Sequence, residues 1–220
     1  MPGGFNPGGY WSDEASLDFL TKTALGQSRK ASGVALPNVA NAVAVSDGGT
    51  HACAIDNEAG LWCWGQGSFG TFGDGKDSVK NIANVEPQFY LASHHTFAPV
   101  RAKIANVSQV AAGDNWTCAL VKDGTVSCWG LDSYRRLGLG PKVTSKVWTA
   151  GWPDKTPVYS EPQVVPGLSE VVEISLGGLH ACALKKDETV WCWGNNQGGQ
   201  IGNGKTSYSV SSPTQVNLPD

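Results

Sequence analysis

A cysteine-containing segment recurs three times in this chain of 220 residues. Each copy opens with a Gly-containing turn, reaches a first Cys, and ends ten positions later in Cys-Trp-Gly. The copies cover residues 48–65, 113–130 and 177–194, and their first cysteines lie 65 and 64 residues apart. A fixed period of this kind indicates a repeat architecture, in which each unit buries its apolar faces against its neighbours.

The stretch between the two cysteines of the middle copy predicts a β-hairpin. If Cys118 is paired with Cys128, the register leaves residues 122–124 as a three-residue turn, with Gly124 at the position that needs a left-handed backbone. The other two copies keep the length but have Ala59 and Glu188 at that position, so we expect slightly strained turns there.

Alternation along these strands predicts two apolar faces for each hairpin. In the middle copy Cys118 and Leu120 share one face, and Ala119 and Trp129 share the other. A hairpin that is apolar on both faces has to be sandwiched between other sheets. Stacking such sheets about an axis gives a propeller or a solenoid, and the 28 Gly, 12 Pro and 9 Trp also favour an all-β chain with many turns.

These residues resemble the repeat of the regulator-of-chromosome-condensation β-propellers, in the Cys-Trp-Gly form typical of bacterial members. An apolar-Gly-x-Gly element follows each Cys-Trp-Gly, at residues 72–75, 137–140 and 201–204. The resemblance implies one four-stranded blade per repeat and binding through loops on the propeller faces. Members include a nucleotide-exchange factor for a small GTPase and secreted inhibitors of β-lactamases. Since a propeller needs roughly four to eight blades, three repeats predict a partial propeller or one completed by oligomerisation.

The repeats predict two parts of the chain. Residues 1–33 lie outside the resemblance and form an N-terminal arm or anchor, with a short helix expected to begin after Ser12. Residues 34–220 carry the three repeats, with long inserts at 77–98 and 143–161. The inserts hold more aromatic side chains than solvated loops need, so we expect intersubunit contacts at Phe89, Tyr90, Phe97, Trp148 and Trp152.

Residues 199–206 spell G-x-x-x-x-G-K-T, the written pattern of a phosphate-binding P-loop. A working P-loop needs a helix that begins at the Lys, so that backbone N–H groups and the helix dipole face the phosphates. The following residues 207–213 are Ser-rich and end in Pro, which disfavours a helix. The other two copies also break the pattern, with Asp77 and Arg135 at key positions. We therefore interpret these glycines as turn residues and expect no nucleotide or other cofactor.

The six cysteines form three pairs that would lie directly opposite each other on paired strands. This geometry favours the disulfides Cys53–Cys63, Cys118–Cys128 and Cys182–Cys192. The alternative is reduced cysteines that act as small core residues, as expected in a cytosol. Disulfides would indicate an extracellular, cell-surface or virion location. A zinc site is not expected, because paired cysteines across a hairpin do not gather four ligands.

The composition limits the possible functions. A net charge of -3 without a basic run argues against a nucleic-acid partner. No apolar stretch is long enough to span a membrane, and the first residues do not resemble a signal peptide.

Since no set of catalytic residues recurs in the repeats, the chain is predicted not to be an enzyme. We expect a non-catalytic protein-interaction or structural module, a subunit of a larger extracellular, surface or virion-like assembly with protein partners, including copies of itself. The alternative is a propeller inhibitor or regulator of another enzyme, either a secreted hydrolase or a GTPase.

Overall fold

The computed structural model describes residues 39, 41–76, 95–142, 147–148 and 156–218. The chain divides into the units Met1–Ala35 and Leu36–Asp220, and all described residues belong to the second unit. The expected N-terminal arm and its helix lie outside the described residues.

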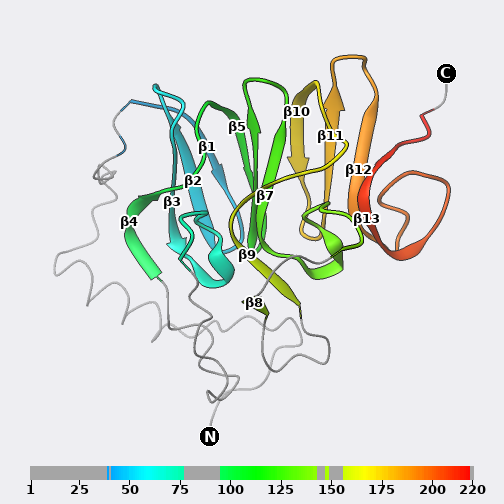
Figure 1. Cartoon of the computed structure of the whole chain (residues 1–220), viewed down its shortest axis with the longest axis horizontal. Helices are drawn as coiled ribbons and strands as arrows, with labels where there is room; N and C mark the ends of the chain where they lie inside the picture. Colours follow the sequence, from blue (N-terminus) through cyan, green and yellow to red (C-terminus); the bar gives the residue numbers. More distant parts are fainter. Residues whose placement is uncertain (1–38, 40, 77–94, 143–146, 149–155, 219–220) are drawn as a thin grey trace, which may run out of the picture. The chain divides into compact units, whose positions relative to one another are not determined.

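Three antiparallel sheets follow one another along the chain (Figure 1). The strands of the first blade are β1 (Ala42–Asp47), β2 (His51–Asp56), β3 (Leu61–Gln66) and β4 (His95–Arg101). Those of the middle blade are β5 (Val107–Ala112), β6 (Trp116–Val121), β7 (Val126–Leu131) and β9 (Pro157–Val164), and β8 (Val147–Trp148) is added outside β9. Those of the last blade are β10 (Val171–Leu176), β11 (His180–Lys185), β12 (Val190–Asn196) and β13 (Ser207–Gln215). The prediction of an all-β chain with three propeller-type blades is confirmed.

The central hairpin of each blade has the register that the cysteine spacing predicts. Cys53 lies opposite Cys63, and the later pairs repeat this arrangement, each with 4.1 Å between the Cα atoms. All three pairs are disulfide-bonded in the structure. The turn residues Ala59, Gly124 and Glu188 have φ values of 62°, 83° and 66°, the left-handed backbone expected at this position.

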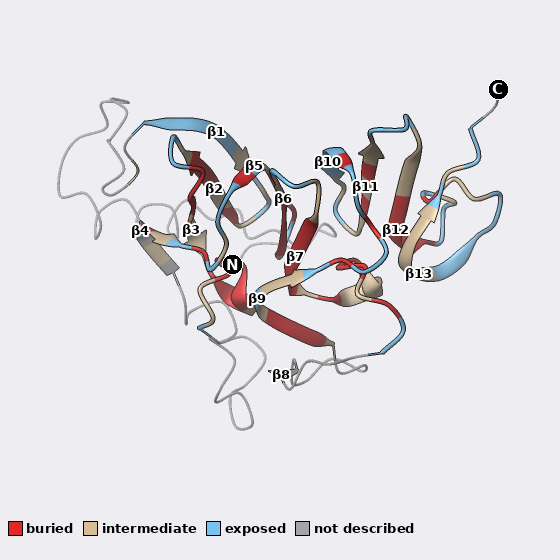
Figure 2. Ribbon diagram, turned by 45° about the horizontal axis from the view of Figure 1, so that its top comes forward, coloured by how far each residue is buried: buried red, intermediate tan, exposed pale blue. Residues whose placement is uncertain are grey.

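The two apolar faces of the middle hairpin belong to two separate cores. Ala119 and Trp129 pack with the first blade around Cys53 and Leu61, whereas the opposite face joins the last blade in a second core. The residues of that second core include Cys118, Leu120, Val126, Ile174, Ala181 and Trp193. Figure 2 shows the result, with buried residues concentrated where one sheet faces the next. The middle blade is therefore sandwiched as predicted.

The fourth strands begin inside the ranges predicted to be inserts. Strand β4 starts at His95, within 77–98, and β8 and the start of β9 lie within 143–161. The reason is that each blade needs a fourth strand, and these segments pair with β3 and β7. In the last blade, the residues after β13 remain hydrogen-bonded to the same blade. The Val216 N–H donates to the Val190 carbonyl, and the Asn217 N–H donates to the Gly202 carbonyl.

Among the residues that the structure describes, no helix has the length and apolar character needed to cross a membrane.

Candidate interaction face

We letter the strands of each blade A to D in chain order, with β9 as strand D of the middle blade. The C–D loops are the connections between the third and fourth strands, residues 67–94, 132–156 and 197–206. In the first two blades this loop packs against strand D of the following blade. The Gly75 N–H donates to the Ser160 carbonyl (3.0 Å), and the Gly140 N–H donates to the Ser211 carbonyl (2.8 Å). The C–D loops thus hold successive blades together as well as forming part of the surface.

A tryptophan from the following blade completes each joint. The indole N–H of Trp129 donates to the Thr71 carbonyl, and that of Trp193 donates to the Arg136 carbonyl, both at 2.9 Å. Gly73 and Gly138 lie against these indoles. They have φ of 70° and 71°, and a Cβ on either would lie 2.8 or 2.7 Å from the indole nitrogen. The apolar-Gly-x-Gly element of the sequence therefore makes room for a neighbouring blade.

The joint between the first two blades also contains a buried histidine. His51 Nε2 lies 2.7 Å from the Thr117 hydroxyl, which donates its proton to the Thr71 carbonyl. His51 Nε2 must therefore be the protonated nitrogen, and Nδ1 is buried with no hydrogen-bond partner among the residues that the structure describes. Burial lowers the pKa of His51 to about 4, because a charged ring would lose its water here.

We expect the free energy of unfolding to fall as the pH decreases from 7 toward 4, because of His51. The unfolded histidine, with a pKa of 6.5, takes up a proton in this range and the folded one does not, so protons favour unfolding. The loss from His51 should be about 2 kcal/mol at pH 5. Urea unfolding of His51→Gln at pH 7.5 and pH 5 is the matched measurement. The variant keeps His180, so the pH dependence that it loses belongs to His51; equal pH dependence in both proteins would contradict the assignment.

The C–D loop of the middle blade holds two buried charged groups. Arg136 donates through Nε to the Leu131 carbonyl (2.6 Å) and lies 5.6 Å from the centre of the Trp116 ring. Burial lowers the pKa of Arg136 to about 10, and it raises the pKa of Asp132 to about 6. Asp132 Oδ1 accepts from the Leu137 N–H. At the same position in the last blade, Asn196 Oδ1 accepts from the Ile201 N–H. The side-chain oxygens of Asp132 and Asn196 therefore make the same hydrogen bond in their two loops.

Two aromatic residues in the C–D loops have a left-handed backbone. Phe69 and Tyr134 occupy the same repeat position, with φ of 64° and 56°, which is unfavourable for bulky residues. The ring of Tyr134 lies 4.8 Å from that of Tyr208 in the last blade. Sequence reasoning missed these residues, although a Ser-aromatic pair at the same distance after Cys-Trp-Gly was a visible signal. Figure 1 shows the two loops on the same side of the sheets.

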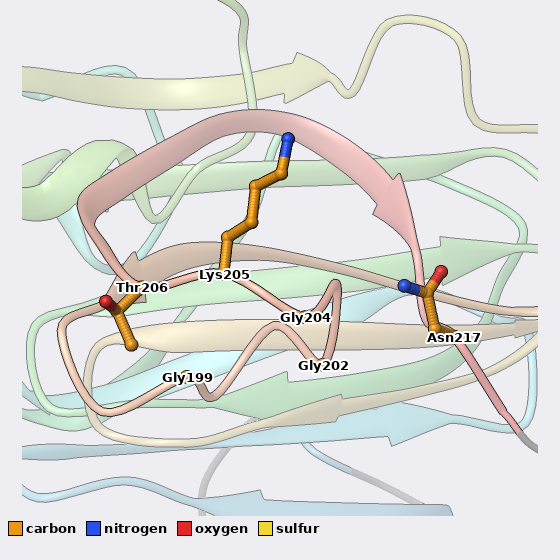
Figure 3. Close-up of a pocket in the computed structure, with 6 residues that line it drawn as sticks. All are labelled: Gly199, Gly202, Gly204, Lys205, Thr206 and Asn217. Atoms are coloured by element: carbon orange, nitrogen blue, oxygen red, sulfur yellow. The ribbon is translucent and has the colours of Figure 1, made fainter.

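The segment that resembles a P-loop lines a hollow of about 490 Å³ on the last blade (Figure 3). Its lining residues are Gly199, Gly202, Gly204, Lys205, Thr206 and Asn217. The segment leads into strand β13 rather than a helix. Four of its N–H groups already donate to nearby residues of the same blade: Gly199 to the Asn196 carbonyl, Ile201 to the Asn196 side chain, Gly202 to the Gly199 carbonyl and Lys205 to the Asn203 side chain. This geometry is that of a turn, and the segment lacks the helix of a phosphate site.

The predicted contact residues are only partly placed. Phe89, Tyr90 and Trp152 lie outside the described residues. Phe97 is in β4, and Trp148 in β8 pairs with Pro157 of β9. Phe97 therefore lies in the fourth strand of the first blade, and Trp148 lies beside the fourth strand of the middle blade. In the described part of the chain, no group of three or more His, Cys, Asp or Glu side chains is arranged to hold a metal ion.

The four-stranded sheets, the cores between them and the repeated joints define a β-propeller repeat protein. Two models of the regulator of chromosome condensation (RCC1) repeat match residues 107–136 with 171–200, and 123–184 with 187–220. The chain belongs to the RCC1 repeat family.

Named relatives agree with this family. Protein pim1 of Schizosaccharomyces pombe is 27% identical over 177 residues, covering 80% of this chain and 31% of its own length. The guanine nucleotide exchange factor SRM1 of Saccharomyces cerevisiae is 28% identical over 182 residues, covering 74% of this chain and 36% of its own length. The crystal structure of human WBSCR16 superposes with a TM-score of 0.59 and 22% identity, over 81% of this chain and 40% of that one. The chain thus spans roughly a third of these relatives' lengths.

Proposed function

We propose that this chain is a non-catalytic protein-interaction module, a subunit of a larger assembly at an extracellular, cell-surface or virion location. The observation that carries the proposal is the position of the two longest connections. They leave the first and middle blades at equivalent places, after β3 and β7, beside the aromatic residues Phe69 and Tyr134. Aromatic side chains dominate the energetics of protein interfaces. The three disulfides support a location outside a reducing cytosol.

Two double variants test the interaction face. Phe89→Ser with Tyr90→Ser changes the first loop, and Trp148→Ser with Trp152→Ser changes the middle loop. The control is Val164→Ser with Val172→Ser, which changes exposed apolar residues on other parts of the blades. Partners cross-linked to the wild-type chain in its native host are identified by mass spectrometry and then purified for affinity measurement. We expect at least one loop variant to weaken binding about 30-fold or more and the control to bind as wild type. Wild-type affinity in both loop variants would reject this face.

A second candidate is a regulator of a small GTPase, because SRM1 is named a guanine nucleotide exchange factor. An inhibitor of a secreted hydrolase would use the same loops. Faster release of a fluorescent GDP from a small GTPase in the presence of this chain would favour the first of these alternatives. Slower hydrolysis by a secreted hydrolase would favour the second.

A further inference from the structure

The fourth strand of each blade is an edge strand, and much of its outer edge is already closed. The C–D loop of the preceding blade donates to the Ser160 and Ser211 carbonyls, which therefore face away from the third strand of their own sheet. Two positions further along, Pro162 and Pro213 have no N–H group and cannot donate to an added strand. Pro99 occupies the same repeat position in β4. The part of the edge that is left for further pairing is the beginning of the strand.

In the middle blade this place is occupied by β8. Val147 lies opposite Val158 and Trp148 lies opposite Pro157, at the beginning of β9 (Figure 1). Val158 also lies opposite Leu131 of β7, so it is paired on both sides, and its side chain is 1% exposed. The added strand is supplied by the long C–D loop of the same blade. The fold therefore accepts one more strand at this position.

The last blade has the same edge without such a strand. Ser209 is the counterpart of Val158 by its pairing with the third strand. The C–D loop of this blade, residues 197–206, leads directly into β13, and among the described residues no strand pairs with β13 from outside. Tyr208 is 61% exposed and Ser209 is half-buried, as Figure 2 shows for the beginning of β13. A following blade is not what covers this place, because in the middle blade it is β8 that does so.

The main chain at Ser209 is suited to pairing with an added strand. Alternate residues of a strand direct their N–H and carbonyl groups to the same side, so those of Ser209 point away from β12, as the Ser211 carbonyl does. The Ser209 carbonyl accepts from the Ser207 hydroxyl of its own strand at 3.3 Å. This distance is longer than that of a typical hydroxyl hydrogen bond, so a main-chain N–H can replace it.

Two side chains beside this edge indicate what kind of peptide it would bind. The exposed ring of Tyr208 lies 4.8 Å from that of Tyr134, which provides an aromatic surface next to the strand. Lys205 immediately precedes β13 and is exposed, and none of the ion pairs formed among the described residues includes it. The edge therefore favours an aromatic residue and an acidic residue in its ligand.

We propose that the beginning of β13 binds an extended peptide of a partner protein as an added antiparallel strand, at the position where β8 pairs with β9. A β-branched residue of the peptide lies opposite Ser209 and exchanges two main-chain hydrogen bonds with it. The next residue is aromatic and lies opposite Tyr208, because opposed residues share one face of a sheet. An acidic residue two or three positions further on comes near Lys205.

This inference rests on the proposed interaction function and names the kind of partner that the last blade takes. Its test uses a synthetic peptide and none of the residues changed in the two loop variants. Failure of the peptide to bind would therefore leave the result with the loop variants standing, and wild-type affinity in those variants would leave the peptide result standing.

The probe is a capped peptide of sequence Thr-Val-Trp-Thr-Glu-Asp, titrated into the oxidised, isotope-labelled chain and followed by NMR. The amide signals of residues 207–210 should shift and reach saturation. The matched control is the same peptide with an N-methyl group on its valine, which keeps every side chain but removes the N–H that would donate to Ser209. We expect this control to bind about tenfold more weakly.

Two variants test the edge from the side of the protein. Ser209→Pro removes the outward N–H and should weaken binding about tenfold, whereas Ser209→Ala keeps it and should bind as wild type. Since this N–H points away from β12, Pro leaves the pairing with β12 in place, and urea unfolding of the variant checks this. If Ser209→Pro proves unfolded, the N-methylated peptide decides the question.

Unshifted amides of residues 207–210 at the highest soluble peptide concentration would overturn the proposal, and so would equal binding of the N-methylated peptide. Shifts of these amides when the protein alone is concentrated would assign the edge to a second copy of the chain instead. Slow hydrogen exchange of the Ser209 amide in the free chain would show that the chain covers this edge itself. Either of these two results would also overturn the proposal.

Discussion

Removal of the disulfide Cys118–Cys128 should destabilise the protein more than removal of Cys182–Cys192. Both bonds close loops with the same sequence separation of 10 residues, so the effect on the unfolded chain is the same, about 2–3 kcal/mol. The middle pair, however, lies wholly between two blades, whereas Cys182 is partly exposed. Replacing the middle pair by Ala therefore also leaves small cavities in the core.

The measurement is urea unfolding of the two double Cys→Ala variants beside the oxidised wild-type protein. The wild-type protein with and without reductant is the control, and reduction should lower the unfolding midpoint. Equal losses in the two variants would show that burial of the middle pair contributes nothing. An unchanged midpoint on reduction would show that the bonds do not stabilise the fold.

Truncation of Trp129 or Trp193 to Ala should cost about 3–5 kcal/mol each, because both indoles are fully buried in a blade joint. Replacement by Phe keeps most of the apolar contact and isolates the indole N–H. We expect Trp193→Phe to cost more than Trp129→Phe. When Trp129 is replaced, the Thr71 carbonyl still accepts a hydrogen bond from Thr117. When Trp193 is replaced, the Arg136 carbonyl loses the one side-chain donor that it has among the described residues, and a buried acceptor without a donor is costly.

Chemical denaturation of the four variants gives these differences directly. If the two Phe variants lose the same stability, the second donor at Thr71 has no energetic role. If the Ala variants lose less than about 1 kcal/mol, these tryptophans do not hold the blades together.

The sequence was sufficient to predict the features that depend on neighbours along the chain. The register of each hairpin follows from the distance between its two cysteines. The left-handed turns at Ala59 and Glu188 follow from that register, since both residues align with Gly124. The two faces of the middle hairpin follow from the alternation of side chains along a strand.

The contacts between blades could not be predicted in the same way. The Thr117 hydroxyl accepts a hydrogen bond from His51, 66 residues away, and donates one to the Thr71 carbonyl, 46 residues away. No periodic pattern indicates that these three residues meet, because only two of the copies have His at the position of His51 and only one has Thr at the position of Thr117. The short strand β8 was missed for a related reason, since it exists only by pairing with β9.

The strand order of the sheets also bears on how a protein of this kind changes its length during evolution. Within the described part of the chain, every sheet contains only strands that are consecutive in sequence, and none includes a strand from another repeat. A tandem duplication or deletion of one repeat, here a segment of 64 or 65 residues, therefore adds or removes a whole blade and leaves every remaining sheet intact. The C–D loop and the buried Trp at each new boundary meet the same partners as before. A gene that encodes such blades can thus gain or lose one in a single recombination event without passing through a misfolded intermediate.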